Sequence, residues 1–527
     1  MPSNTRWTCP AFVLLVTAAT FLLKSERFFA PVASDSGLFA YTASSLLDGA
    51  VLFRDTPFAF RLPGVYLVDA LAMTVLGQGS LAIQVLDAAW TGLTALALVY
   101  LLRGLFRPST VVAATMLFLV LVSAPALAES GNTSDAYLVL PTIIAVRYVV
   151  FATQPSSTGR ALVMAGLAFG FAVLFKQPAI LVPTALALAL VGLWRRDGLP
   201  WSVITRRCAL FIASLSLPLL VLVAFTVAEG TFTNMVYEVV VFPLQASAAG
   251  RNPLVKVDLF LRAGEVMGFF LFPAFVLCLV SAVVLFQGRV PLRRTHCVLI
   301  VWLGGTVLSA LVGGMGSGHY YLPVVPSMCA FAAIGIEWAT SGEGVLRRYS
   351  SRGRLALMAF VVGIMLLPNL ARDLSEFQSG FLRYLRDPPA ATSMEQLAQF
   401  VRVRTDQVDY IYGYGSHKYV SVAFLARRRF ATRHVSPKMF DGRGYAEGNF
   451  PRPDQLSWMP EELQQDIIRN RPKLIFGFTD EALAEAPYAD LESWIRANYA
   501  QLDPDSLPLW LRSEENENVL PIRVLAR

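Results

Sequence analysis

The sequence predicts an α-helical polytopic membrane protein with a small C-terminal α/β domain. Of its 527 residues, 55% are hydrophobic and only 15% are charged, and the mean hydropathy is +0.53. Soluble globular proteins carry about 25% charged residues, so this composition excludes an ordinary soluble protein. The long apolar stretches end near residue 372, and the hydrophilic remainder predicts a separate domain outside the bilayer.

A helix that crosses a bilayer needs about 20 mainly apolar residues. About eleven stretches meet this requirement, at 8–28, 80–102, 109–128, 135–152, 161–176, 178–194, 208–228, 264–286, 297–315, 321–340 and 355–371. Two weaker stretches, 36–48 and 63–77, have polar interruptions. We expect them to form amphipathic helices that lie on the membrane surface.

The arginines of the short loops predict the orientation, because loops rich in Arg and Lys stay in the cytoplasm. One alternate set of loops carries Arg103, Arg107, Arg160, Arg195, Arg196, Arg206, Arg207, Arg289, Arg293, Arg294, Arg347, Arg348, Arg352 and Arg354. The N-terminus is then cytoplasmic, and the region from residue 372 onward lies outside. The net charge of +7 is an orientation signal, and no nucleic-acid partner is expected. The lack of cysteine pairing motifs and of a recognisable cleavable signal fits a bacterial inner (plasma) membrane.

The composition divides the chain into a transmembrane domain, 1–371, with a first outer loop at 29–79, and a periplasmic or extracellular α/β domain, 372–527. In the second domain we expect strands at 408–412 and 473–478, helices at 460–470 and 491–499, and a Gly/Pro-rich loop at 441–454. Gly413 and Gly415 do not complete a dinucleotide fingerprint, so they indicate a turn between strand and helix.

Two acidic residues stand at helix starts on the expected outer side. Asp35 follows the first span, and Asp135 follows the short polar loop 129–134. A helix N-terminus stabilises a carboxylate, so a simple capping role explains each residue as well as a functional one does. Carboxylates that converge at one membrane face can, however, divide the roles of a general base and an orienting group.

Two further residues at the outer side have a functional and an ordinary interpretation. Lys176 precedes Gln177 and Pro178, and a lysine beside a broken helix at membrane depth needs a partner or has a function. His319 lies at the mouth of the tenth span, where a lone histidine is more often an interfacial residue. The neighbouring Tyr320 fits an aromatic belt.

These motifs occur in a fixed order along the chain. They are Asp35-x-Gly-x-x-Ala-Tyr41, Leu46-x-x-Gly49, Arg54-Asp55, Arg61-x-Pro-Gly-x-Tyr66, Lys176-Gln-Pro and His319-Tyr320. Together they resemble the GT-C superfamily of membrane glycosyltransferases. The nearest branch is the protein O-mannosyltransferase-like group, which includes the lipid A aminoarabinose transferase. The resemblance covers roughly residues 10–370.

The resemblance implies transfer of a hexosyl or pentosyl group from a polyprenyl-phosphate donor to an acceptor hydroxyl on the outer face, with inversion. Asp35 occupies the position of the catalytic acid and is expected to be the general base, although Ser36 replaces the second acid of the family pattern. Asp135 matches the second acidic position. The expected contacts to the donor phosphate come from Arg61, Arg54, Lys176 and His319, and the expected substrate pocket consists of Tyr41, Asp55, Glu129, Asn132 and Tyr320.

A monophosphate donor does not demand a divalent ion, so no metal or other cofactor is expected to be essential. The expected partners are the lipid-linked donor, membrane lipids and an acceptor that is a lipid, a glycan or a protein. Physical chemistry agrees with these roles, because fixed cations stabilise the charge that develops on a phosphate leaving group.

Two other functions remain open from the sequence. A transporter or flippase of lipid-linked saccharides would also need many spans and outer cations. Such proteins often have internal repeats and broken helices at mid-membrane, whereas here the polar residues collect at one face. A receptor or scaffold that binds through its C-terminal domain is the other alternative, and no recognition motif in that domain favours it.

Overall fold

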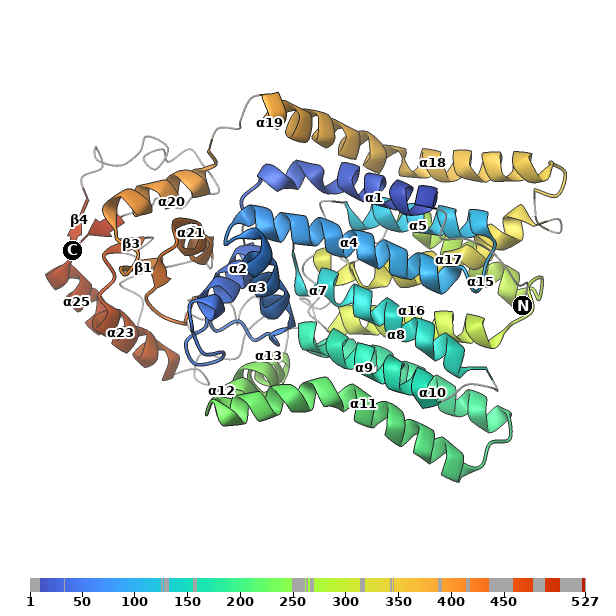
Figure 1. The fold of residues 1–527 in the computed structure, drawn as a ribbon, viewed down its shortest axis with the longest axis horizontal. Coiled ribbons are helices and arrows are strands. Elements are labelled where there is room, and N and C mark those ends of the chain that lie inside the picture. The colour runs from blue at the N-terminus through green and yellow to red at the C-terminus, as the bar shows by residue number, and fades with distance from the viewer. Residues whose placement is uncertain are drawn as a thin grey trace.

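The computed structural model is a bundle of long helices with a small sheet domain at one end (Figure 1). It describes residues 10–32, 34–124, 127, 132–154, 159–248, 261, 264–265, 270–312, 318–341, 344, 346–386, 391–413, 418–435, 458–476, 489–502 and 524–526. Within these ranges, five helical segments are long and apolar enough to cross a membrane: Ser80–Leu102, Ser134–Ala152, Gln177–Arg196, Trp201–Ala228 and Arg294–Val312. The chain is therefore a multi-pass membrane protein.

Each predicted span contains a helix. These helices are α1 (Pro10–Lys24), α4 (Ser80–Leu102), α5 (Pro108–Val122), α7 (Ser134–Tyr137) with α8 (Val139–Ala152), α9 (Gly159–Phe175), α10 (Leu181–Arg196), α11 (Trp201–Ala228), α15 (Phe272–Phe286), α16 (Arg294–Val312), α17 (Val324–Thr340) and α18 (Ser351–Glu376). The two weaker stretches form α2 (Ser34–Leu47) and α3 (Gly64–Leu76). The agreement follows from backbone chemistry, since a segment in lipid must satisfy its own N–H and C=O groups and a helix does so.

The bundle has a central helix and peripheral ones. Every residue of α17 except Glu337 is buried, whereas Leu220 and Val221 of α11 are 58% and 62% exposed. Small residues bring α15 and α17 together, because Gly335 N–H donates to Ser281 Oγ at 2.9 Å. Close approach of small residues is the usual way in which helices associate in a bilayer, because apolar side chains gain little by moving out of the equally apolar lipid.

One end of the bundle, which we call the domain end, carries α2 and α3 together with α12 (Phe232–Val236), a π-helix (Tyr237–Val241) and α13 (Phe242–Ala248) (Figure 1). The glycine of the Pro63-Gly64 motif allows α3 to meet α9 closely. A Cβ atom at Gly64 would lie 2.7 Å from the carbonyl oxygen of Leu174. The domain end is thus packed around the first outer loop predicted from the sequence.

The C-terminal domain is a five-stranded mixed sheet with helices, as predicted. The strand order is β2-β1-β3-β5-β4, with β1 (Tyr410–Gly413), β2 (Arg429–Phe430), β3 (Leu474–Phe476), β4 (Ala500–Gln501) and β5 (Val524–Ala526). Strand β1 pairs in parallel with β2 and β3, and β5 pairs antiparallel with β3 and β4. The helices are α20 (Ser393–Arg404), α21 (Lys418–Ala426), α23 (Trp458–Asn470) and α25 (Ala489–Asn498). The predicted loop 441–454 and the predicted turn residue Gly415 lie outside the described residues.

Helix α18 runs through residue 372, where the composition changes. It continues as a π-helix (Phe377–Leu382) and as α19 (Arg383–Arg386). Phe381 of this extension packs against Phe21 of α1, with ring centroids 5.3 Å apart. The change in composition therefore falls within a helix, and the sheet domain begins with α20.

Candidate active site

A buried ion pair joins two of the residues singled out in the sequence. Lys176 Nζ lies 2.9 Å from Oδ1 and 2.8 Å from Oδ2 of Asp135, and the two side chains are only 4% and 3% exposed. Asp135 stands in the first turn of α7, which begins after the N-cap Thr133. Helix α9 ends at Phe175 because Pro178 lacks the N–H that a continuing helix would donate. The broken helix thus presents Lys176 to the carboxylate.

Arg61 lies next to this pair on the segment that precedes α3. Its guanidinium hydrogen-bonds to Tyr320 and interacts electrostatically with Asp35 and Asp135. Burial acts to lower the pKa of Arg61, but the larger combined effect of Tyr320 and the two carboxylates raises it above its ordinary value. Arg61 is therefore a permanently charged group at the domain end.

Asp35 completes the group from the first turn of α2. Its charge interacts with those of Arg61 and Lys176 and also with Tyr320. The structure thus brings two acids and two cations together from four segments that are distant in the sequence. We call Asp35, Arg61, Asp135, Lys176 and Tyr320 the polar cluster.

His319 and Tyr320 border the polar cluster from a 3-10 helix (Gly318–Tyr321) just before α17. His319 Nε2 lies 3.9 Å from Asp135 Oδ2. The ammonium of Lys176 lies 3.5 Å from the centroid of the Tyr320 ring, a cation–π contact that further stabilises the charge. Lys176 therefore contacts a carboxylate on one side and an aromatic face on the other.

The structure does not bring every predicted residue into the polar cluster. Arg54 makes a two-point pair with Asp55, from Nε to Oδ1 and from Nη2 to Oδ2, each at 3.1 Å. Both side chains are exposed at the surface, 55% and 42% respectively. The backbone turns at Phe53, whose φ of 66° is left-handed. Arg54 and Asp55 are thus paired with each other at the exposed surface, and the expectation that they contact the donor phosphate and line the pocket stays a prediction.

Two other predicted pocket residues make contacts outside the polar cluster. The hydroxyl of Tyr41 accepts the Phe430 N–H at 2.7 Å, so it contacts the C-terminal domain. The side chain of Asn132 is fully buried and donates to Asp69, so it is a structural partner. Glu129 lies outside the described residues.

Asp69 is a residue that the sequence reading missed. Its carboxylate is fully buried in α3 and accepts from Asn132 Nδ2 and from the Tyr137 hydroxyl, the latter at 3.3 Å. The Asn132 carbonyl in turn accepts from Ser36 Oγ at 2.9 Å. Asp69 therefore ties α3 to the segment that carries Asp135, and Ser36 ties that segment to α2 beside Asp35. In the sequence, Asp69 stands out as a single acid within an otherwise apolar helix.

A second buried pair lies deeper in the bundle. Lys24 Nζ of α1 lies 3.0 Å from Asp87 Oδ2 of α4, and both side chains are 3% exposed. Asp87 is an acid within the apolar helix α4, where such a residue usually has a partner or a function. Its pairing with Lys24 joins α1 to α4.

Gln177, which belongs to the Lys176-Gln-Pro motif, connects two parts of the site. Its Nε2 donates to the carbonyl of Phe60 at 3.1 Å and to that of Val239 at 3.3 Å. Phe60 directly precedes Arg61, and Gln177 directly follows Lys176. The amide thus holds the two cation-bearing segments in a fixed relation.

Within the ranges that the structure describes, no three His, Cys, Asp or Glu side chains are grouped so that they could hold a metal ion.

The comparisons with known proteins agree with this architecture. Residues 55–226, less than half of the chain, match the family model described as dolichyl-phosphate-mannose-protein mannosyltransferase. No curated protein sequence matches the chain.

Solved structures share the fold over most of the chain. ArnT from Cupriavidus metallidurans bound to undecaprenyl phosphate superposes with a TM-score of 0.58 at 16% identity, and its apo form with 0.59 at 15%. Each match covers 91% of this chain and 95% of ArnT. The archaeal oligosaccharyltransferase AglB from Archaeoglobus fulgidus, in complex with an inhibitory peptide and a dolichol-phosphate, gives a TM-score of 0.54 at 12% identity, over 88% of this chain and 69% of AglB. The GT-C-like fold expected from the ordered motifs is confirmed.

Proposed function

We propose that this chain is a glycosyltransferase that moves a sugar from a polyprenyl-phosphate donor to an acceptor hydroxyl. We place the reaction at the outer face of the inner (plasma) membrane, with the N-terminus in the cytoplasm. The matched family model supports the reaction class. The polyprenyl phosphates held by ArnT and AglB, which have the same fold, support the class of donor.

The single observation that carries the proposal is the meeting of Asp35, Arg61 and Lys176 with Asp135 and Tyr320 at the domain end. A phosphate leaving group needs a fixed cation, and an acceptor hydroxyl needs a base. Arg61 suits the first role because its planar guanidinium pairs with phosphate through two hydrogen bonds. We assign the second role to Asp35 because the family resemblance places the catalytic acid at this position, while both oxygens of Asp135 accept hydrogen bonds from Lys176.

In the proposed reaction, the acceptor oxygen attacks the anomeric carbon as the bond from that carbon to the phosphate oxygen breaks. The acceptor proton passes to Asp35, and polyprenyl phosphate leaves with one additional negative charge. One displacement inverts the anomeric centre. Because Asp35 loses its charge as the phosphate gains one, the total charge of the buried site stays constant, which avoids a large desolvation cost.

The arrangement supports a different role for Asp135 than for Asp35. Its two oxygens both accept from Lys176, so we propose that it fixes the lysine ammonium rather than removing a proton. Lys176 then adds positive potential near the leaving phosphate. The reaction we propose needs no metal ion, since Arg61 and Lys176 supply the positive charge.

The test uses the purified full-length chain in detergent, with undecaprenyl-phosphate-linked pentose and hexose donors and an envelope lipid and glycan extract as acceptor. Release of undecaprenyl phosphate is measured. Asp35→Asn is expected to lower the rate by about 10²–10⁴-fold, the usual contribution of a general base, with an unchanged thermal transition. Asp48→Asn, an exposed acid just after α2, is the matched control and should retain the wild-type rate. Full activity of the Asp35 variant would remove the proposed base.

The transporter alternative makes a different prediction. It requires movement of the lipid-linked saccharide across a sealed bilayer and no chemical change in the saccharide. The polar cluster lies at the end of the bundle that carries α2 and α3 (Figure 1), which favours a reaction at the membrane surface. Product formation in detergent, where no gradient exists, supports the transferase. Translocation in liposomes without any product supports the transporter.

A further inference from the structure

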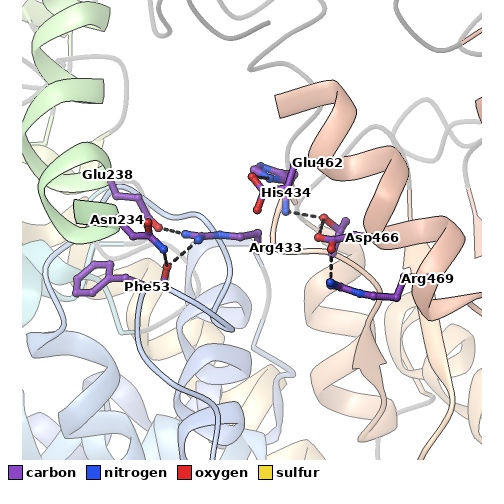
Figure 2. A network of polar contacts seen from close by, with 9 residues as sticks. Phe53, Asn234, Glu238, Arg433, His434, Glu462, Asp466 and Arg469 are labelled. Carbon is purple, nitrogen blue, oxygen red and sulfur yellow. Dashed lines mark hydrogen bonds and ion pairs between the residues drawn. The ribbon is translucent and has the colours of Figure 1, made fainter. Parts of the chain in front are cut away.

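The C-terminal domain contacts the segment that carries Arg61. We call residues 51–63, between α2 and α3, the Arg61 loop. Arg433, which follows β2, makes two hydrogen bonds to the backbone of this loop, and Figure 2 shows the one to Phe53. Its Nη1 donates to the carbonyl of Phe53 at 2.7 Å, and its own carbonyl accepts the Phe58 N–H at 2.8 Å.

Arg433 also connects the Arg61 loop to the transmembrane domain. Its guanidinium forms an ion pair with Glu238 of the π-helix, and the two side chains are 11% and 4% exposed. Asn234 of α12 donates to the same Phe53 carbonyl at 3.1 Å. This carbonyl is therefore held by two donors from different elements. The left-handed backbone of Phe53, which is disfavoured for a bulky side chain, needs such support.

The domain presents Arg433 from a fixed segment. Thr432 Oγ1 donates to Asp466 Oδ2 at 3.0 Å, and His434 Nε2 lies 3.1 Å from Glu462 Oε2. Both acids belong to α23, and Asp466 is held in turn by Arg469 at 2.5 Å. Figure 2 shows Arg433 pointing from this segment toward Phe53, Asn234 and Glu238. The anchored neighbours leave the Arg433 side chain little freedom.

The restraint extends along the loop to the site. The ring centroids of Phe58 and Phe242 lie 5.1 Å apart. The Phe60 ring stacks on the same Phe242 ring, with centroids 5.5 Å apart. Gln177 holds the Phe60 carbonyl, so the loop is fixed on both sides immediately before Arg61. Release of the Phe53 carbonyl and the Phe58 N–H would remove the two hydrogen bonds that Arg433 makes to this loop.

A second contact joins the domain to α2, which carries Asp35. The Phe430 N–H donates to Tyr41 at 2.7 Å. At Gly37, α2 meets α21 so closely that a Cβ atom would lie 1.9 Å from Ser421 Oγ and 2.6 Å from Ser421 Cβ. The glycine two positions after Asp35 is therefore one of the places where the two domains touch.

We infer that the C-terminal domain is a positioning element of the site, in which Arg433 holds the Arg61 loop and the Gly37–Ser421 contact holds α2. Arg433 touches none of the polar cluster and is a positioning residue rather than a catalytic one. The expected effect of this role on catalysis rests on the proposed glycosyl transfer, whereas the ordering of the Arg61 loop does not.

The first experiment compares Arg433→Ala, Arg433→Lys and wild type as full-length proteins in lipid nanodiscs. Amide hydrogen exchange is followed for peptides within 51–63 and for α4 and α16. Arg433→Ala should raise exchange in the Arg61 loop at least 10-fold and leave α4 and α16 unchanged. Arg433→Lys keeps the charge beside Glu238 but has no fork of donors to reach Phe53 as well, so its exchange should be intermediate.

The matched control is Arg427→Asn. Arg427 also bridges the two domains, from Nη2 to the carbonyl of Gln78 at 3.0 Å, but it contacts the connection after α3 rather than the Arg61 loop. Asn accepts the left-handed backbone of this position, where φ is 54°. The control should leave exchange in 51–63 and the transfer rate at wild-type values. Equal effects of Arg427→Asn and Arg433→Ala would overturn the inference, since any loss of docking would then suffice.

The second experiment tests the α2 contact by steric rescue. Gly37→Ala should lower kcat for sugar transfer at least 10-fold while the donor KM changes less than 3-fold. The double variant Gly37→Ala/Ser421→Gly removes the opposing side chain and should recover most of kcat. Absence of rescue would contradict a positioning role for this contact.

The proposed function and the positioning role can be contradicted independently of each other. If wild type releases no polyprenyl phosphate from any lipid-linked sugar, the proposed function fails, and the exchange data still decide the positioning role. If wild type is active and Arg433→Ala keeps both its rate and its loop protection, the inference fails alone.

Discussion

Both carboxylate oxygens of Asp135 accept hydrogen bonds from the ammonium of Lys176, at 2.9 and 2.8 Å, and neither side chain is more than 4% exposed. Asp135 begins α7, and Lys176 follows the end of α9. The pair therefore fixes the domain ends of two helical segments relative to each other.

Removing one partner of this pair should be costly. Asp135→Asn leaves a buried ammonium without its counter-charge and is expected to destabilise the protein by about 3–5 kcal/mol. The double variant Asp135→Leu/Lys176→Met replaces both charges by apolar groups and should recover most of that loss. Thermal unfolding in detergent measures the stability of each variant. Transfer should fall in both variants, because Asp135→Asn no longer fixes the ammonium of Lys176 and the double variant has no ammonium.

Arg61 and Arg54 should respond differently to substitution. Arg61→Lys keeps the charge but loses one charge-assisted hydrogen bond to the donor phosphate, worth about 1.5–3 kcal/mol. We expect the kcat/KM for the donor to fall by roughly 10–100-fold. Arg54→Ala removes only an exposed pair with Asp55 and should change kcat/KM less than 2-fold. A large loss in the Arg54 variant would support the expectation that this residue binds phosphate.

Asp69 should act through Asn132. Asp69→Ala leaves the buried Asn132 amide unsatisfied, which costs about 1–3 kcal/mol. A double-mutant cycle with Asn132→Ala, measured by thermal unfolding, should give a coupling energy above about 0.5 kcal/mol because the two side chains are in contact. Pairing Asp69→Ala with Asp48→Asn should give additive effects. In the transfer assay, kcat should fall more than donor KM rises, since Asp69 orders the segment that carries Asp135.

The C-terminal domain should lose stability in acid through Glu462. Its hydrogen bond with His434 holds the pKa of Glu462 below its ordinary value. A depressed carboxyl pKa adds stability above the unfolded pKa of about 4.3, and this contribution is lost as the pH falls through the folded value. Glu462→Gln should therefore have a lower transition temperature than wild type at pH 6, and the difference should shrink toward pH 3. A difference that stays constant with pH would show that Glu462 is not the titrating group.

The sequence by itself determined the membrane-spanning helices. Hydropathy locates them because backbone groups in lipid have no partner other than the helix itself, so local composition decides the outcome. The same local chemistry determined β1, β3 and α23, whose buried apolar residues follow strand or helix periods. The ordered motifs also selected Asp35, Asp135, Arg61, Lys176 and Tyr320, which the structure brings together.

Only the tertiary structure decided which polar residues share an environment. Arg54 and Arg61 are equally basic in the sequence, but Arg54 is exposed and pairs with Asp55, whereas Gln177 holds the Phe60 carbonyl directly before Arg61, which hydrogen-bonds to Tyr320. The partners of Asp69 and Arg433 could not be read from the sequence, because they lie 63 and 380 positions away in the chain. Contacts over such separations depend on how the helices and the C-terminal domain dock, and no local pattern encodes that packing.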